Sequence, residues 1–200
     1  DIYKATGDTY EKCDGLRILV EGPVDVGFKN VPRTIELVKQ SKADEIWLLT
    51  SSKVKEYEGV DRVFSQIPPK DCAKIFRSCD AIVKLSYIEG MFGPPLEMFH
   101  CGGTAIVYDV TGHDEYIVNG KNGIVVKTDD EQDVIDSINK LKGDSKYLNK
   151  LKKGAVKTAS EWCSWQESSA KFFDTVTKLN KMSSVTQEVL ETKSKFFFDV

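Results

Sequence analysis

The chain has 200 residues, with 28 basic against 31 acidic side chains and a net charge of −3. Because no basic stripe dominates, this composition argues against nucleic-acid binding as the main task. No apolar run reaches the roughly 18–20 residues that span a bilayer, and no secretory signal opens the sequence. The length predicts one domain with a real hydrophobic core and an appended tail.

Short apolar runs alternate with helical patterns along most of the chain. The runs predict strands over residues 16–20, 44–50, 62–64, 80–85, 104–108 and 123–126. Helices are predicted from Pro32 onward, over 70–79, over 95–101 and over 129–141, with one helical turn over 114–118 and further helices beyond residue 144. This alternation is typical of the α/β class. It predicts a Rossmann-like, doubly wound parallel sheet of about six strands, with helices on both faces and ligands beyond the carboxyl ends of the strands.

The sequence predicts three parts. Residues 1–15 are polar without sustained periodicity and are expected to form a linker or a loosely docked N-terminal arm. Residues 16–180 are expected to form the Rossmann-like domain, and residues 181–200 a C-terminal helical tail. Because the chain starts at Asp1 rather than Met, we expect an excised fragment or a processed product.

The cysteines and histidines show no metal-ligand spacing. The five cysteines are odd in number, form no CxxC pair, and are interpreted as reduced thiols of a cytosolic protein. His100 and His113 are the only histidines, so no metal site is expected. The cysteines are Cys13, Cys72, Cys79, Cys101 and Cys163.

The most informative stretch begins at Glu89, just after a predicted strand, and ends at Glu97. Two glycines within it let the backbone turn tightly and approach a ligand, while two prolines stiffen the exit. The free N–H groups of the turn are therefore expected to face one concavity, which suits an anion such as phosphate. These N–H groups belong to Met91, Phe92 and Gly93.

Two carboxylates beside a phosphate would repel it, so we expect them to bind another part of the ligand. Taken alone, Glu97 is explained equally well as a helix-dipole partner in a first turn, and a glutamate in the position of Glu89 is more often a solvated loop residue. Together they suit a ligand with hydroxyls on both sides of a phosphate, which is the order of groups in a nucleoside diphosphate sugar. Lys29 is the candidate positive partner, with a solvated loop lysine as the alternative.

Residues 86–97 (Ser-Tyr-Ile-Glu-Gly-Met-Phe-Gly-Pro-Pro-Leu-Glu) resemble the E-x7-E signature of a large family of retaining glycosyltransferases. This family, the glycosyl transferases group 1, has the GT-B fold and contains sucrose synthase and many polysaccharide mannosyltransferases. The similarity continues through residues 101–107 and 112–123 and covers roughly residues 16–175. GT-B enzymes have two Rossmann-like domains, and the chain resembles the C-terminal, donor-binding one.

The resemblance implies a role for each candidate residue. Glu89 would contact the donor sugar at the reacting end, Glu97 would hold the nucleotide ribose, and Lys29 would stabilise the leaving diphosphate. Backbone amides around Met91, Phe92 and Gly93 would meet the sugar and the diphosphate. The nucleotide would be flanked by Ser86 and by the loop at residues 67–68.

The implied activity is retaining transfer of a hexosyl or related group from a nucleoside diphosphate sugar, without a metal or other cofactor. The acceptor would be a glycan or a lipid-linked molecule, held by an N-terminal domain that this chain lacks, so the fragment is not expected to be active alone. The implied setting is polysaccharide biosynthesis in the cytoplasm. Peripheral association with the inner membrane face is left open.

Two departures from the family pattern keep other functions open. The family usually has Arg directly after the Gly that ends the first strand, whereas Pro23 follows Gly22 here, and Arg33 is a candidate substitute. Phe92 also stands where the family tends to have Gly. A non-catalytic interaction module, or a sugar-nucleotide epimerase or hydrolase on the same fold, therefore remains an alternative. The absence of G-x-G-x-x-G counts against a dinucleotide oxidoreductase.

Overall fold

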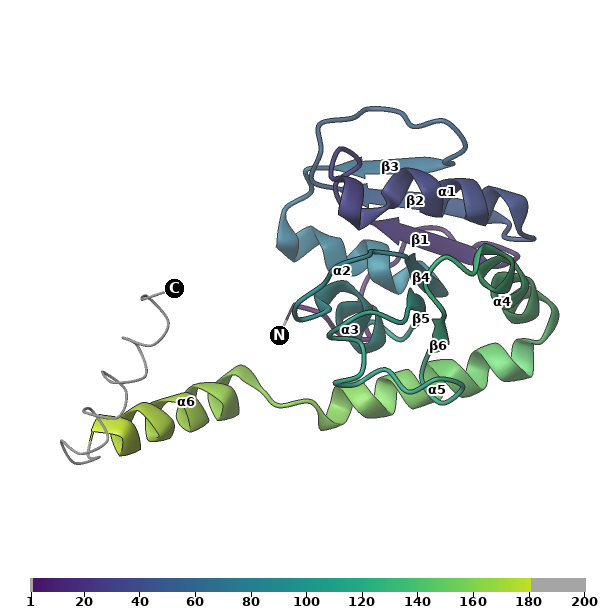
Figure 1. The fold of residues 1–200 in the computed structure, drawn as a ribbon. Coiled ribbons are helices and arrows are strands. Elements are labelled where there is room, and N and C mark those ends of the chain that lie inside the picture. The colour runs from purple at the N-terminus through teal and green to yellow at the C-terminus, as the bar shows by residue number, and fades with distance from the viewer. Residues whose placement is uncertain (1, 181–200) are drawn as a thin grey trace, which may run out of the picture. The chain divides into compact units, whose positions relative to one another are not determined.

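The structure, a computed structural model, describes residues 2–180. Its centre is one six-stranded sheet in the order β3-β2-β1-β4-β5-β6, in which every neighbouring pair is parallel (Figure 1). This confirms the predicted Rossmann-like α/β sheet. The strands are β1 (Arg17–Glu21), β2 (Glu45–Thr50), β3 (Arg62–Ser65), β4 (Ala81–Lys84), β5 (Thr104–Tyr108) and β6 (Ile124–Val126).

Helices pack on both faces of the sheet. α1 and α4 lie together on one face, while α2 and α3 lie together on the other, with α5 beside α3 (Figure 1). Three of the helices carry proline in the first turn, where the missing N–H has no helical partner to lose. The helices of this part are η1 (Gly27–Lys29, a 3₁₀ turn), α1 (Val31–Gln40), α2 (Pro69–Arg77), α3 (Gly93–His100), α4 (Glu131–Gly143) and α5 (Ser145–Glu161).

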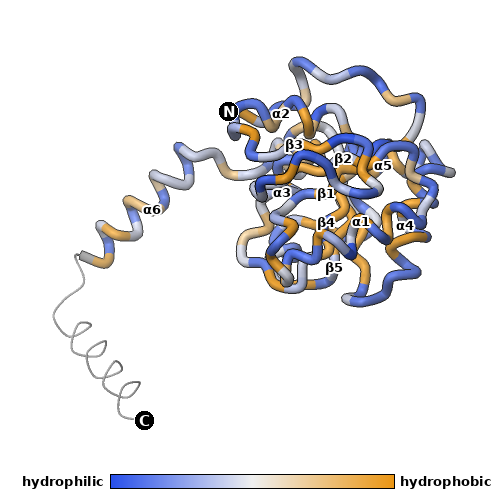
Figure 2. Tube along the Cα trace, turned by 90° about the horizontal axis from the view of Figure 1, so that it is seen from above, coloured by the Kyte–Doolittle hydropathy of each residue, from blue (hydrophilic) through white to orange (hydrophobic). Residues whose placement is uncertain are grey.

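Alternating side chains of the strands build two apolar layers. Ile18 and Val20 of β1 belong to the cluster that also contains Ile35 of α1 and Val134 of α4. Leu19 lies between them in the strand and therefore faces α2 and α3, since successive side chains point to opposite faces. Figure 2 shows the strands as predominantly apolar and the surrounding loops as polar, as expected for a sheet covered on both faces.

The direction in which successive strands are added to the sheet reverses between β1 and β4. The chain runs outward from β1 through β2 to β3 and then returns to β4 on the other side of β1. In open parallel sheets, the loops that leave the carboxyl ends of two such strands diverge and form a crevice for ligands. The loops in question are residues 22–30 and 85–92, which contain Lys29 and Glu89.

Most predicted elements agree with the structure within two residues. The single helical turn predicted over residues 114–118 is present as hydrogen-bonded turns, in which the N–H groups of Tyr116 and Ile117 donate to the His113 carbonyl at 3.2 and 2.8 Å. One element was not predicted: the connection between the first strand and the helix that begins near Pro32 contains the 3₁₀ helix η1, which ends where Asn30 adopts a left-handed conformation with φ of 54°.

The chain divides into two compact units, residues 1–161 and 162–200. The N-terminal arm belongs to the first unit, where Tyr3 packs edge-on against Phe76 and the Arg77 guanidinium donates to the Asp8 carbonyl at 2.9 Å. The division thus differs from the sequence-based boundaries at residues 15/16 and 180/181. The described part of the second unit contains α6 (Trp165–Asn180), and the predicted tail over 181–200 lies outside the described residues.

Among residues 2–180, no helix combines the length and the apolar character needed to cross a bilayer.

Candidate functional site

The loops after β1 and β4 are bound to each other at the reversal point of the sheet. The backbone N–H of Tyr87 donates to the Phe28 carbonyl at 2.8 Å. The buried Asn30 side chain donates from its amide to the Leu85 carbonyl at 3.1 Å. These two bonds fix the position of η1, and therefore of its last residue Lys29, relative to the end of β4.

The structure brings Lys29 and Glu89 together as an ion pair. The Lys29 Nζ lies 2.8 Å from both Oε1 and Oε2 of Glu89. The Glu89 side chain is 7% exposed and the Lys29 side chain 22% exposed, so the ammonium is the more accessible partner. The two residues singled out from the sequence thus form one charged centre, although they stand 60 positions apart in the chain.

A second lysine, which the sequence reasoning missed, extends this centre into the sheet. Lys84 is the last residue of β4, and its side chain is 3% exposed. Its Nζ lies 2.7 Å from a carboxylate oxygen of Glu21 and 3.7 Å from Oε1 of Glu89. The only signal in the sequence was a lysine inside an otherwise apolar strand.

Arg33, the proposed substitute for a cation after Gly22, lies elsewhere. Its guanidinium binds Glu131 of α4, with Nε 2.6 Å from Oε1, and Glu36 of its own helix at 2.6 Å. Both carboxylates hold Arg33 on the surface that α1 shares with α4. The structure thus pairs Arg33 with two carboxylates, and its role as a substitute for the cation after Gly22 stays a prediction.

Glu97 lies on α3, the helix that follows the loop at the carboxyl end of β4. It is the fifth residue of the helix rather than a first-turn residue, so the dipole explanation of its position does not hold. Burial and the nearby Glu21 carboxylate raise its pKa to about 7, and the Tyr3 hydroxyl and the Lys84 ammonium oppose this increase. A carboxylate placed only to complement a helix N-terminus would have its pKa lowered instead.

Because the pKa of Glu97 is raised in the folded state, the free energy of unfolding should depend on pH. The folded state holds this proton more tightly than the unfolded chain, whose ordinary pKa is 4.5, so the stabilisation is complete below pH 4.5 and is lost as the pH rises through about 7. We therefore expect Glu97→Gln, which mimics the protonated form, to gain roughly 2 kcal/mol over the wild type between pH 5 and pH 8. Urea unfolding at the two pH values measures this difference.

Glu58→Gln is the matched control, because the Glu58 side chain is 98% exposed. It should show no gain over the same pH range. If Glu97→Gln is destabilised equally at both pH values, the carboxyl is not held in its protonated form by burial.

The turn between the two glutamates has a buried anchor. The Phe92 side chain is 0% exposed, and the Tyr116 hydroxyl donates to the Phe92 carbonyl. The Gly93 N–H donates to the Met91 carbonyl at 3.0 Å, so the expectation of a free Gly93 N–H is wrong. The Met91 side chain, in contrast, is 54% exposed at the rim of the turn.

The loop that contains Thr111 and Gly112 packs against this turn. The Thr111 hydroxyl donates to the Glu89 carbonyl at 2.8 Å. Gly112, with φ of +89°, lies so close to the Gly90 carbonyl that a Cβ atom would overlap the oxygen. The sequence reasoning assigned no role to these two residues, because loop-to-loop contacts leave no periodic pattern.

Ser86 lies fully buried just after β4, and its Oγ is the one buried side-chain polar atom without a hydrogen-bond partner among the described residues. An unpaired buried hydroxyl costs about 1–3 kcal/mol, so we expect Ser86→Ala to leave stability unchanged or to raise it by up to ~1 kcal/mol. Denaturant unfolding measures the change. Thr104→Val is the control, because the equally buried Thr104 hydroxyl donates to the Asn122 carbonyl at 2.7 Å and its removal should destabilise. A similar loss in both variants would contradict the assignment.

The remaining predicted contact, the loop at residues 67–68, follows β3, which lies two strands away from β1. Gln66 precedes it with φ of 56°, and its N–H donates to the Thr50 carbonyl at 2.8 Å. This loop is thus at the same edge of the sheet as Lys29 and Glu89, and it is held in a left-handed turn.

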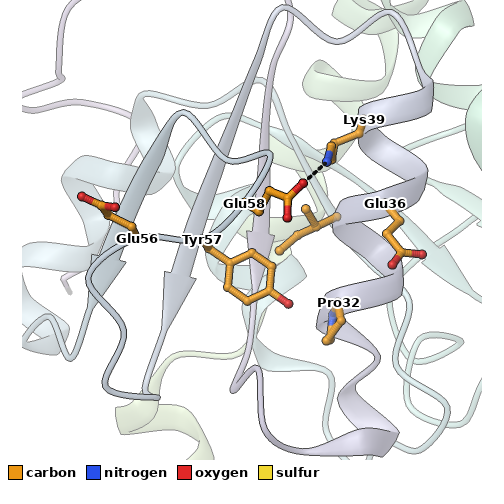
Figure 3. A pocket seen from close by; sticks show the side chains of 7 residues that line it. Pro32, Glu36, Lys39, Glu56, Tyr57 and Glu58 are labelled. Atoms are coloured by element: carbon orange, nitrogen blue, oxygen red, sulfur yellow. Dashed lines mark ion pairs between the residues drawn. The ribbon is translucent and has the colours of Figure 1, made fainter.

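A hollow of about 400 Å³ lies elsewhere, between α1 and the loop from β2 to β3 (Figure 3). Its lining contains none of the predicted site residues. Three carboxylates line it against one ammonium, that of Lys39, which lies 3.9 Å from Glu58. The resulting negative charge disfavours a diphosphate, so we place the candidate site at the β1–β4 crevice. The lining residues are Pro32, Ile35, Glu36, Lys39, Glu56, Tyr57 and Glu58.

Comparisons with known proteins agree with this architecture. The sequence profile of the family described as glycosyl transferases group 1 matches residues 29–158. The chain therefore belongs to the group 1 glycosyltransferase family.

Individual relatives show the same relationship. The N,N'-diacetylbacillosaminyl-diphospho-undecaprenol alpha-1,3-N-acetylgalactosaminyltransferase of Campylobacter jejuni is 33% identical over 92 residues, which are 46% of this chain and 24% of that enzyme. The C-terminal domain of the group 1 protein LpcC from Francisella tularensis superposes with a TM-score of 0.61 at 19% identity, covering 72% of this chain and 84% of that one. HepE of Anabaena, in complex with UDP-glucose, superposes with a TM-score of 0.63 at 18% identity, covering 91% of this chain and 49% of that one.

The fold is thus that of the C-terminal half of a GT-B glycosyltransferase. The chain spans only 24% of the Campylobacter enzyme and 49% of HepE.

Proposed function

We propose that the crevice between β1 and β4 binds a nucleoside diphosphate sugar, as the donor for retaining glycosyl transfer. The observation that carries this proposal is the charged centre itself. Lys29 lies 2.8 Å from both oxygens of Glu89, and the half-buried Glu97 lies on the helix that follows the same turn. A cation paired with one carboxylate, with a second carboxylate on the helix that follows, suits a ligand with a diphosphate between two hydroxyl-bearing rings.

Each residue has a distinct role in this proposal. The Lys29 ammonium leaves Glu89 and neutralises the diphosphate, whose charge increases as the glycosidic bond breaks. The Glu89 carboxylate, released from Lys29, accepts hydrogen bonds from hydroxyls of the donor sugar. Glu97 accepts hydrogen bonds from the ribose hydroxyls, and the Ser86 hydroxyl finds its missing partner on the nucleotide. Backbone N–H groups of Met91 and Phe92 face the sugar and the diphosphate.

No metal is needed in this scheme, because an ammonium and backbone N–H groups supply the positive charge. We propose that the acceptor, a glycan or a lipid-linked molecule, is bound by another part of the enzyme. The name of the Campylobacter relative includes an undecaprenol diphosphate, which favours a lipid-linked acceptor and action at the cytoplasmic membrane face. HepE in complex with UDP-glucose supports a nucleotide-sugar donor.

Calorimetric titration of the chain with UDP-glucose, UDP-N-acetylglucosamine, GDP-mannose and ADP-glucose tests the donor assignment. We expect one of these to bind and Glu97→Ala to weaken that binding about tenfold, since two ribose hydrogen bonds to a carboxylate are lost. Glu115→Ala, on the turn before Tyr116, serves as the control and should bind like the wild type. Failure of all four donors to bind, or binding that is indifferent to Glu97→Ala, would contradict the proposal.

A further inference from the structure

Lys84 is a buried cation with an unusual position for its residue type. It ends β4 after Ala81, Ile82 and Val83, which are all 0% exposed. An apolar residue would satisfy the packing there, and a buried ammonium is costly unless carboxylates pair with it. The structure supplies that pairing, since the Lys84 Nζ contacts Glu21 at 2.7 Å and approaches Glu89 at 3.7 Å.

The strand register explains how this cation reaches the site. Val20 of β1 pairs with Val83 of β4, so Glu21 and Lys84 are the next residues of the two strands. Val20 and Val83 belong to the core on the α1 side, and the following side chains therefore point to the face that α3 covers. Glu97 lies on α3, and the charges of Glu21 and Lys84 both act on its carboxyl. Lys84 is thus the cation that the carboxylates of the crevice share.

The two lysines differ in their freedom to move. The Lys29 side chain is 22% exposed, at the end of a three-residue 3₁₀ helix, whereas the Lys84 side chain is 3% exposed within the sheet. When a diphosphate adds negative charge to the crevice, the accessible ammonium can turn toward it. The buried one cannot leave without removing the cation that Glu21 binds.

We propose that Lys84 is a positioning residue, which holds Glu89 in place for the donor sugar after Lys29 has transferred to the diphosphate. This inference rests on the proposed function. The Glu89 side chain is 7% exposed, so it requires a cation at all times, and Lys84 is the one within reach besides Lys29 among the described residues. Lys84 therefore affects the binding of the donor's sugar and not of its nucleotide, because Glu89 contacts the sugar in the proposed function.

Direct binding of the diphosphate by Lys84 is the competing role. Its Nζ already contacts both the carboxylate and the backbone carbonyl of Glu21, at 2.7 and 3.2 Å. With the side chain buried on the sheet face, these contacts leave the ammonium directed at carboxylates rather than at solvent. The two roles predict different results. If Lys84 bound the diphosphate, its removal would weaken the binding of the nucleotide sugar and of the free nucleoside diphosphate alike. If Lys84 positions Glu89, its removal weakens the binding of the nucleotide sugar alone.

The test uses a variant that keeps the charge balance. Removing Lys84 alone leaves the Glu21 carboxylate without its cation and Glu89 with Lys29 alone, and such a variant can unfold for electrostatic reasons. Glu21→Gln/Lys84→Met removes one charge of each sign, and Glu21→Gln is its matched control. Both variants and the wild-type chain are titrated with the donor selected from the four named above and with the corresponding free nucleoside diphosphate. Urea unfolding confirms that each variant is folded.

We expect the double variant to bind the nucleotide sugar about tenfold more weakly than the wild type. It should bind the free nucleoside diphosphate within threefold of the wild type, and Glu21→Gln should bind both ligands within threefold. The proposal is overturned if the loss for the nucleotide sugar is not at least threefold greater than the loss for the free diphosphate, or if Glu21→Gln alone produces the whole loss. A wild-type chain that binds none of the donors contradicts the proposed function itself.

Discussion

Lys29→Met is expected to reduce glycosyl transfer by the complete enzyme by roughly 10²–10³-fold, because removing one preorganised charge-stabilising group typically costs about 3–4 kcal/mol in the transition state. The same change should weaken donor binding by about tenfold or more. Stability should fall by only ~1 kcal/mol or less, because Glu89 retains Lys84 at 3.7 Å. Initial rates, calorimetric titration and urea unfolding measure the three quantities.

Lys152→Met is the matched control for this prediction. The Lys152 Nζ lies 2.9 Å from Asp80, and the side chain is 27% exposed, close to the exposure of Lys29. Asp80 precedes β4, so this pair lies at the amino end of the strand, away from the crevice. Transfer and donor binding should be unchanged in Lys152→Met. Equal losses in the two variants would show that the effect is not specific to the donor site.

Gly112→Ala is expected to disable the site without removing any functional group. Gly112 has φ of +89°, where a side chain is strained, and its Cβ would overlap the Gly90 carbonyl. The loop that carries Glu89 must then move, because the overlapping atom belongs to the backbone. We expect a destabilisation of about 3 kcal/mol, from strain and overlap together, and a loss of donor binding of at least tenfold. Urea unfolding and titration measure these effects.

Gly120→Ala separates the two causes. Gly120 has φ of +71° but no atom near the position of a Cβ, so this variant has the strain without the overlap. Its destabilisation should be about 1–2 kcal/mol, and donor binding should be unchanged. If Gly112→Ala behaves like Gly120→Ala, the turn at Glu89 does not depend on its contact with the loop of Gly112.

The sheet was predictable because its strands are buried on both faces. Such strands form continuous apolar runs, and the six runs predicted the strands in the succession in which they follow one another along the chain. Lys84 was placed in the predicted strand over residues 80–85, but the apolar run did not show what its ammonium contacts. Only the register of β4 beside β1, with Glu21 as a neighbour, shows that this ammonium is buried.

Sequence-distant contacts of the site were predictable only where the parallel topology brings two loops together. Lys29 and Glu89 were found because they stand in loops after predicted strands, and the parallel topology brings such loops together. The pairing of Arg33 with Glu131 gave no signal in the sequence, because Glu131 lies 98 positions away on α4. Tyr3 gave no signal at all. It belongs to a polar arm whose contact with Glu97 exists only in the folded chain.

The most direct test of the donor-site assignment is a crystal structure of the chain with the nucleoside diphosphate sugar that binds it. We expect the diphosphate to lie in the crevice between β1 and β4, with the Lys29 Nζ moved from Glu89 to a phosphate oxygen. The sugar hydroxyls should lie on Glu89 and the ribose hydroxyls on Glu97. A ligand bound in the hollow beside α1, or a bound donor with Lys29 still paired to Glu89, would contradict it.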